Sequence, residues 1–462
     1  MLKIHVVRPG GHLYYVDDLV PGRAEGTGVA GEAPGTWSGA GTVGLGVSGT
    51  VELRDFGEVL GGRDPGSGRA LRAQMGDRSV SGYDLTFCAP KSVSLLHLLA
   101  PGEIAGEVGA GHRTAVADAV GYLQRVATGV RRSRDGQVTR LAATGVVAGE
   151  FVHRTSRALD PHLHTHLVVA NVAQGVDGRW SAVDGRRVFA HLHAIRGIYH
   201  ARLRMELHSR LGVAWEVPPS GMGDVRGVDP GLRFLFSQRS AAIAEYAARR
   251  PGGPSRPSRR QRTRGAFYAT RPDKDRSRTV ESMMGEWKDR AADFGFELGD
   301  LTRVVGLGRA ARPGEEIEPD RVRLRLEGLV SSGRSLAHRD VVAVIAAASP
   351  GGAPAQLIES VATRVVGAAG APLPSRGVAD RSADGEDLAL RRPGTFEPRW
   401  AVAEVARAVA RGEERLVSVS MVTAPGEEGR GSGPRWPDPS PDLSPIRGDE
   451  VARVAVDRQL GR

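Results

Sequence analysis

The segment DPHLHTHLVVANV, residues 160–172, decides the expected fold of this chain. His162, His164 and His166 alternate strictly along it, and a run of leucine and valine follows at once. In a β-strand every second side chain points to the same face, so the three imidazoles would line up on one face. Three aligned polar rings are costly unless they are used. The segment therefore predicts both a strand and a candidate site.

The sequence around this segment alternates between strand and helix patterns. Residues 83–90 and 162–173 alternate or carry runs of β-branched residues, as strands do. Residues 112–127 and 188–211 place apolar side chains at spacings near four, which is typical of amphipathic helices. Strands interleaved with such helices predict a sheet with helices packed on it.

The composition favours a globular protein with a polyanionic partner. The chain has 462 residues, of which 40% are hydrophobic, enough for about two to four domains with a sizeable core. Its formal net charge is +10 and its pI is about 10.2, as is typical of nucleic-acid-binding proteins. Almost all of this charge is arginine, so an arginine-rich codon usage in a soluble protein is the alternative explanation.

The cysteine content and the hydropathy predict a cytoplasmic protein. Cys88 is the single cysteine, which excludes an intramolecular disulfide framework and a cysteine-rich zinc module. The N-terminal sequence has no apolar core of signal-peptide length, and no run approaches the roughly 20 apolar residues that span a membrane. We therefore expect no membrane insertion.

Two segments have the composition of long connections. Residues 21–50 are rich in glycine and lack periodicity, so we expect a long loop there. Residues 249–278 are rich in proline and arginine, with few acidic residues to balance them. A nucleic-acid contact and an ordinary solvated segment are equally good interpretations of that second stretch.

The character of the chain changes beyond about residue 305. Short helices rich in valine, alanine and arginine are expected at residues 320–330, 336–348 and 356–367. The stretch from residue 423 to residue 447 has the composition of disorder. We divide the chain into a first domain at residues 1–303, a small helical region at 304–422 and a Pro/Gly-rich tail at 423–462.

The histidines have the spacing of a metal site. His164 and His166 share one strand face, and His153 lies eleven residues before His164 in another β-prone stretch. If these stretches are adjacent strands, three neutral nitrogens converge and leave open positions on a metal, as a catalytic site requires. An ion held there would polarise a phosphodiester. The alternative is a histidine stripe without a ligand. We leave His162 out as a neighbour that contacts solvent or substrate.

Several motifs together resemble a known family. HRTSRALDPHLHTHLVVANV (153–172) and GYDLTFCAPKSV (82–93) are similar to the relaxase domain of MobF-type conjugative relaxases, the TrwC/TraI-like proteins. These belong to the histidine-hydrophobe-histidine class of single-strand endonucleases. Other stretches agree in order and spacing over roughly residues 1–300: LYY (13–15), TWSGAGTVGLGVSGTV (36–51), RLGVAWEV (210–217), FSQRS (236–240) and TRPDKDRS (270–277).

The resemblance implies a fold and a reaction. The family's fold is α+β, with a central antiparallel sheet as a palm and helices packed on it. Tyr14 would attack a phosphodiester at the nick site of a transfer origin, which leaves a 5′-phosphotyrosyl link and a free 3′-hydroxyl. Asp84 would accept the tyrosine proton or orient a ligand histidine. The metal, with Mg²⁺ or Mn²⁺ the first expectation and Zn²⁺ the alternative, would be held by His153, His164 and His166.

The sequence departs from the family in two places. Many members carry a second tyrosine pair a few residues after the first, but here the next tyrosine after Tyr15 is the distant Tyr83. We therefore expect either that Tyr15 is the second nucleophile or that one tyrosine acts twice. Larger members also carry a helicase, whose phosphate loop needs a lysine. No lysine follows Lys288, so we expect no helicase or ATPase activity from residues 289–462.

The resemblance also implies the partners. We expect binding of single-stranded DNA at a transfer origin, together with accessory relaxosome proteins, a coupling protein and a separate helicase. The candidate contacts to the DNA backbone are Arg154, Arg157, Arg239, Arg271 and Lys274. Two other functions fit the same residues. One is a catalytically inactive relic that binds or regulates its origin, and the other is a rolling-circle replication initiator.

Overall fold

The computed structural model describes most of the first 368 residues. The described residues are 2–11, 33–73, 76, 79–218, 220–249, 265–266, 269–270, 278–308, 322, 324–326, 328–329 and 337–368. The expected tail at residues 423–462 lies outside them, as does most of the Pro/Arg-rich stretch at 249–278.

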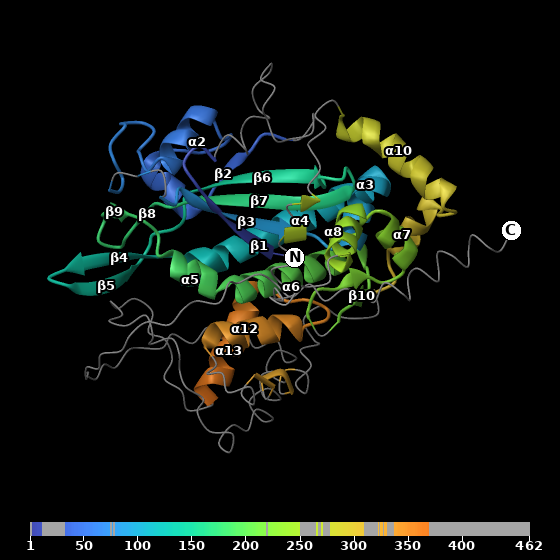
Figure 1. Ribbon diagram of the computed structural model, residues 1–462. Coiled ribbons are helices and arrows are strands. Elements are labelled where there is room, and N and C mark those ends of the chain that lie inside the picture. Colours follow the sequence, from blue (N-terminus) through green and yellow to red (C-terminus); the bar gives the residue numbers. More distant parts are fainter. Residues whose placement is uncertain are drawn as a thin grey trace.

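An antiparallel sheet forms the centre of the molecule (Figure 1). Within the described residues it has five strands in the order β1-β3-β7-β6-β2, and every pairing is antiparallel. The strands are β1 (Leu2–Val7), β3 (Gly82–Cys88), β7 (Pro161–Ala170), β6 (Ala148–Thr155) and β2 (Thr36–Ser38). The expected α+β fold with a central antiparallel palm is confirmed.

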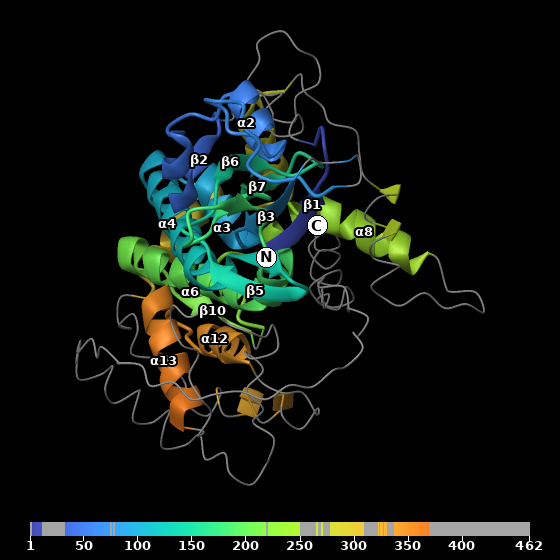
Figure 2. The same ribbon diagram turned by 90° about the vertical axis from the view of Figure 1, so that its left-hand side faces the viewer.

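One face of the sheet is covered by a layer of helices. Alternation along β7 directs Leu163, Leu167 and Val169 into this layer, and β3 contributes Leu85 and Phe87. Figures 1 and 2 both place the helices on the same side of the sheet. They are α3 (Lys91–Leu99), α4 (Gly102–Tyr122) and α6 (Leu192–Leu211). The continuous apolar layer makes this face the main core of the molecule.

Helix α4 begins ten residues before the expected start at residue 112. Its first half is glycine-rich and carries little apolar periodicity, so the sequence pattern there is weak. The glycines serve the packing instead: a Cβ at Gly111 would lie 2.8 Å from Leu207 of α6. Close approach of the two helices therefore explains a helical segment that propensity alone does not favour.

The opposite face of the sheet is covered over part of its length. Helix α2 (Leu53–Leu60) places Phe56 and Val59 against Val168 and Ala170 of β7, in a second apolar cluster. In Figure 2, α2 lies on the side of the sheet away from α6. The same face of β7 carries the three histidines in the other half of the strand. One end of this face is thus apolar core, and the other end is the polar candidate site.

The expectation of a long loop over residues 21–50 is wrong for its second half. Residues 36–45 form strand β2 and the short 3-10 helix η2 (Ala40–Leu45). Gly39 has a positive φ of 97°, and a Cβ there would lie 2.3 Å from the carbonyl oxygen of Val146. Glycine is required at that position for close packing against the sheet, so it is not a sign of a loop.

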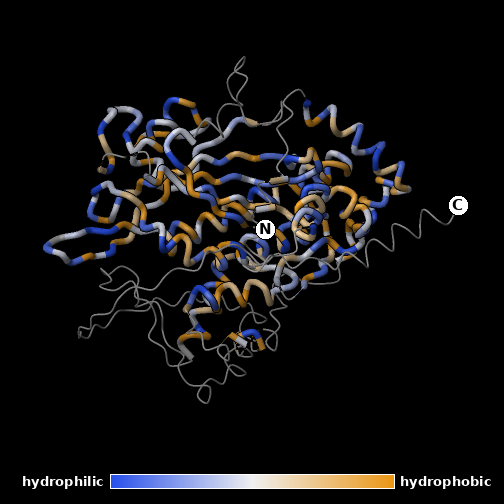
Figure 3. Tube along the Cα trace, viewed as in Figure 1, coloured by the Kyte–Doolittle hydropathy of each residue, from blue (hydrophilic) through white to orange (hydrophobic). Residues whose placement is uncertain are grey.

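Shorter elements complete the fold. The hairpin of β4 and β5 projects from one end of the molecule, whereas the hydrophobic residues concentrate in the sheet and its helices (Figures 1 and 3). The remaining elements are η3 (Leu123–Ala127), β4 (Gly129–Arg134), β5 (Gln137–Ala142), β8 (Ala173–Gln174), β9 (Trp180–Ser181), α5 (Gly185–Ala190), β10 (Trp215–Glu216), β11 (Asp224–Val225), α7 (Pro230–Leu235), α8 (Gln238–Ala248), α10 (Val280–Asp293) and η4 (Leu298–Val304).

Two later helices pack on the outer side of α6. They are α12 (His338–Ala347) and α13 (Ala355–Ala368), close to the expected helices at 336–348 and 356–367. The buried Arg204 of α6 donates from Nη2 to the carbonyls of Ala346 at 2.9 Å and Ser349 at 2.8 Å, and from Nη1 to that of Gly221 at 2.6 Å. These helices therefore share the core of α6, while the domain boundary at residues 303–304 stays a prediction.

None of the helices in the described part of the chain has the length and apolar character needed to cross a membrane.

Replacing Arg204 by alanine should lower the free energy of unfolding by about 3 kcal/mol, because buried carbonyls would lose bonds to a charged donor. Arg204→Lys should recover part of the loss, since one ammonium cannot reproduce the guanidinium fork. Urea denaturation measures the effect, and the exposed Arg54→Ala is the control, expected within about 0.5 kcal/mol of the wild type. Equal urea midpoints for Arg204→Ala and the wild type would contradict the role of Arg204 in holding α12 against α6.

Candidate active site

Three histidines from two neighbouring strands converge on one face of the sheet. His153 of β6 lies directly opposite His164 of β7, and His166 follows two residues along the same strand. Their ring centroids are 5.3 Å apart for the opposed pair and 5.1 Å for each of the other two pairs. One ligand atom from each residue lies within 4.8 Å of the other two. Among the residues that the structure describes, it is the one group of three or more side chains with this property.

Hydrogen bonds at Nδ1 orient two of these rings. His166 donates from Nδ1 to the Asp84 carboxylate, at 2.9 Å to Oδ2 and 3.0 Å to Oδ1. His164 donates from Nδ1 to the carbonyl oxygen of His162 at 2.9 Å. A proton at Nδ1 puts the lone pair on Nε2, the nitrogen that then faces a metal. Both rings are therefore held in one tautomer and one orientation.

Asp84 is fixed by its own neighbours. It is buried in β3 on the histidine face, where Thr86 donates from Oγ1 to its Oδ1 at 3.3 Å. In the register of the sheet, Thr86 lies opposite His166. The carboxylate is thus aimed at the imidazole and does not point into open solvent. Sequence motifs indicated Asp84, but the supporting Thr86 carried no signal of its own.

Burial favours the neutral form of two of the three histidines. It lowers the pKa of His164 to about 3, with the nearby His166 acting in the same direction. Burial also lowers the pKa of His153 well below its usual value, and the two neighbouring imidazoles add to this. Neutral imidazole is the form that binds a metal ion. Three convergent nitrogens, two of them on rings fixed by hydrogen bonds, therefore fit a divalent metal with open coordination positions.

The predicted nucleophiles lie outside the described residues. Tyr14 and Tyr15 belong to residues 12–32, which the structure does not describe. Strand β1, which precedes them in the chain, pairs with β3 so that His5 lies opposite Asp84.

The predicted DNA contacts are scattered. Arg154 lies where the register of β6 and β7 shifts, between His153 and Thr155, and it pairs with Glu281 of α10 at 3.9 Å. Arg239 donates from Nη1 to the carbonyl oxygen of Thr270 at 2.5 Å and to its Oγ1 at 2.7 Å. Arg157 lies half-buried in the turn between β6 and β7. Arg271 and Lys274 lie outside the described residues.

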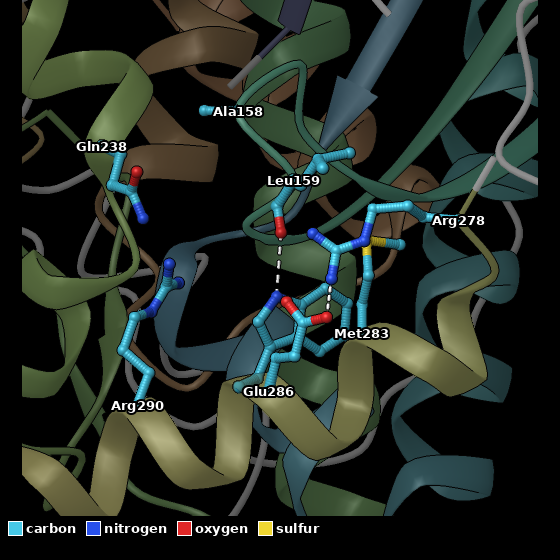
Figure 4. Close-up of a pocket in the computed structure, with 8 residues that line it drawn as sticks. Ala158, Leu159, Gln238, Arg278, Met283, Glu286 and Arg290 are labelled. Atoms are coloured by element: carbon cyan, nitrogen blue, oxygen red, sulfur yellow. Dashed lines mark hydrogen bonds and ion pairs between the residues drawn. The ribbon is translucent and has the colours of Figure 1, made fainter. Parts of the chain in front are cut away.

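The turn that leads into β7 is clamped by side chains that the sequence did not reveal. Asp160 is buried and accepts hydrogen bonds from Arg290 Nη2 and from the backbone N–H of Gln238, both at 2.9 Å. Trp287 donates from Nε1 to the carbonyl oxygen of Leu159 at 2.8 Å (Figure 4). A pocket of about 180 Å³ lies beside this turn, lined by Ala158, Leu159, Gln238, Arg278, Met283, Glu286, Trp287 and Arg290.

Comparisons of sequence and fold with known proteins point to one family. The family model for the TrwC relaxase matches residues 13–294. The multifunctional conjugation protein TraI of Escherichia coli is 30% identical over 365 residues, which are 74% of this chain and 19% of TraI. The chain therefore spans about a fifth of the length of that relative.

Solved structures of the conjugative relaxase TrwC are similar in fold. The metal-bound complex of TrwC with oriT DNA has 30% sequence identity and a TM-score of 0.56, and it covers 64% of this chain and 100% of its own. The copper-bound complex of TrwC with oriT DNA has 29% identity and a TM-score of 0.55 over the same shares. Both likenesses extend to sequence as well as fold.

Replacing Asp84 by asparagine should weaken metal binding by about 10- to 100-fold, because His166 loses the charged acceptor that orients its ring. Titration calorimetry with Mn²⁺ measures the affinity. Glu103→Gln makes the same carboxylate-to-amide change on an exposed side chain and should leave the affinity unaltered. An Asp84→Asn protein that binds Mn²⁺ as tightly as the wild type would exclude this role of the carboxylate.

Proposed function

The chain belongs to the TrwC relaxase family, and we propose that it is a site- and strand-specific DNA nickase and strand transferase of conjugation. It would cut one strand at a transfer origin and keep the 5′ end bound to tyrosine. The observation that carries the proposal is the cluster of His153, His164 and His166 with Asp84 behind it, in a chain that the relaxase model matches over most of its described length.

The histidine cluster would hold the metal of the reaction. When bound, a divalent ion supplies positive charge to the scissile phosphate and leaves positions open for its oxygens. The tautomers fixed at His164 and His166 support binding through Nε2. We propose Mg²⁺ or Mn²⁺ as the native ion, with Zn²⁺ as the alternative.

Tyr14 would be the nucleophile. Its phenol oxygen forms a bond to phosphorus while the bond to O3′ breaks, and the departing O3′ takes up a proton. A phenol with a pKa near 10 is a weak nucleophile at neutral pH, so its proton must be removed as attack proceeds. Both oxygens of Asp84 contact His166, which supports an orienting role for this carboxylate over that of the base. Tyr15 would be the second nucleophile, unless Tyr14 acts twice.

Single-stranded DNA would lie across the histidine face. The TrwC structures contain oriT DNA, and the positive charge of this chain suits the same kind of ligand. We propose backbone contacts by Arg157, Arg271 and Lys274. Arg154 and Arg239 are bound to Glu281 and Thr270, so they would support the binding surface through those contacts.

The remaining steps of the transfer reaction would need further protein components. Residues 289–462 contain no lysine and hence no phosphate loop, so we propose that the helicase that unwinds the DNA lies outside these residues. Accessory relaxosome proteins and a coupling protein would complete the assembly in the cytoplasm.

Tyr14→Phe should abolish the covalent protein–DNA adduct while single-stranded DNA binding persists, because only the attacking oxygen is removed. The assay uses labelled oligonucleotides tiled across the DNA that flanks the gene, incubated with Mn²⁺ and separated on a denaturing gel. Tyr15→Phe is the matched control and should still form the first adduct. A wild-type protein that binds but forms no adduct on any tile would instead favour a DNA-binding relic.

Removing the metal should stop nicking without releasing the DNA. Treatment with EDTA is expected to abolish the adduct and to change oligonucleotide affinity by less than about threefold, because phosphate contacts from arginine and lysine supply most of the binding. Excess Mn²⁺ should restore the adduct. Persistent nicking in EDTA would rule out the metal.

Mobilisation of a plasmid that carries the nicked tile separates conjugation from replication. A transfer relaxase should support mobilisation of that plasmid into a recipient. Replication of the plasmid without transfer would indicate a rolling-circle initiator.

A further inference from the structure

His162 lies on the histidine face, one strand step beyond the metal cluster. Its ring stacks on that of His164, with centroids 4.7 Å apart and an angle of 27° between the planes. The nitrogens that lie within 4.8 Å of one another belong to His153, His164 and His166, and His162 is not in that group. The residue is therefore next to the proposed metal centre without being one of its three ligands.

A second feature of His162 is the hydrogen bonding of its ring. The hydrogen bond to His164 uses the backbone carbonyl of His162 and leaves its imidazole nitrogens uninvolved. Within the described part of the chain, no side chain or backbone group hydrogen bonds to that ring. Yet the side chain is half-buried. A half-buried polar ring in this position can hydrogen bond to water or to a bound ligand.

The backbone just before His162 is held in place. Four donors from α3, α8 and α10 bind residues 159–161: Trp287 Nε1 to the Leu159 carbonyl oxygen at 2.8 Å, Arg290 Nη2 and Gln238 N to Asp160 at 2.9 Å each, and Lys91 Nζ to the Pro161 carbonyl oxygen at 2.6 Å. Figure 4 shows Leu159, Gln238 and Arg290 of this clamp around the neighbouring pocket. A side chain carried on so fixed a backbone is preorganised for contact with a ligand.

We propose that His162 binds the substrate directly, through a hydrogen bond from its ring to the phosphodiester next to the scissile one. The His162 ring lies against that of the proposed ligand His164, with centroids 4.7 Å apart, so it borders the place where the scissile phosphate would bind. A strand of DNA with its scissile phosphate at the metal cluster would then present its next phosphate to His162. This assignment rests on the proposed function and names a contact within the same site.

Two substitutions separate hydrogen bonding from stacking. His162→Phe keeps an aromatic ring against His164 but has no donor, whereas His162→Gln keeps a donor. The probe is the tiled single-stranded oligonucleotide that the wild type binds most tightly, with affinity measured by fluorescence anisotropy in EDTA. We expect about tenfold weaker binding for His162→Phe, the loss of one hydrogen bond to a charged acceptor. His162→Gln should bind within about threefold of the wild type.

Metal affinity provides the second measurement. Calorimetric titration with Mn²⁺ should give the same affinity for His162→Phe and the wild type, whereas His164→Ala should lose binding. Weaker Mn²⁺ binding by His162→Phe would make His162 a ligand or a support of one, and would overturn the proposal. Unchanged oligonucleotide binding by His162→Phe would overturn it as well.

The binding assay does not depend on nicking. If the wild type binds DNA but never forms an adduct, the nickase proposal fails, while a tenfold loss in His162→Phe still supports the contact. If His162→Phe binds DNA normally and the wild type forms the adduct, the contact fails and the nickase proposal stands. A wild type that binds no tile overturns the contact together with the proposed function.

Discussion

The strict alternation of side chains along β7 is the constraint on which the structure depends. Leu163, Leu167 and Val169 point into the helix layer, so the intervening positions must point to the opposite face. A shift of one residue in register would bury the imidazoles under α4 and α6 and expose the apolar side chains. The core therefore fixes the histidine face, and the metal cluster gains its geometry from packing on the other side of the sheet.

A buried polar contact adds to this apolar packing. Thr165 lies between His164 and His166 but faces the helices, where its Oγ1 is 2.8 Å from Nε2 of His112. Nδ1 of the same imidazole is 2.9 Å from the hydroxyl of Tyr199 in α6. Burial lowers the pKa of His112 to about 3, so the ring is neutral, with one donor and one acceptor for these two hydroxyls. A satisfied network of this kind specifies one register of strand against helix.

The sequence predicted what depends on local pattern. Periodicity predicted the strand with His164 and His166 and the helix that became α6. The order of the motifs, through the family resemblance, predicted the antiparallel palm. Contacts between distant segments carried no such pattern: the clamp on Asp160 joins the β7 turn to α8 and α10, over 78 and 130 residues of chain. Alternation could not predict the face that Arg154 occupies, because the register of β6 and β7 shifts between His153 and Thr155.

The outer helices α12 and α13 are also held by polar contacts. Arg204 ties α6 to the carbonyls at the end of α12, and Asp118 of α4 accepts from the backbone N–H of Ala355 at the start of α13. The positive charge of Arg204 thus lies at the C-terminus of α12, and the negative charge of Asp118 lies at the N-terminus of α13. Each charge is opposite in sign to the partial charge of that helix end. Helix α6 is thereby held between the outer helices and the sheet, and it carries Tyr199, the hydroxyl that meets His112. Packed elements thus connect residues 337–368 to β7, the strand that carries the histidines. A loss of packing at residues 337–368 would therefore act on the site by weakening the contacts that fix the register of β7 against the helices.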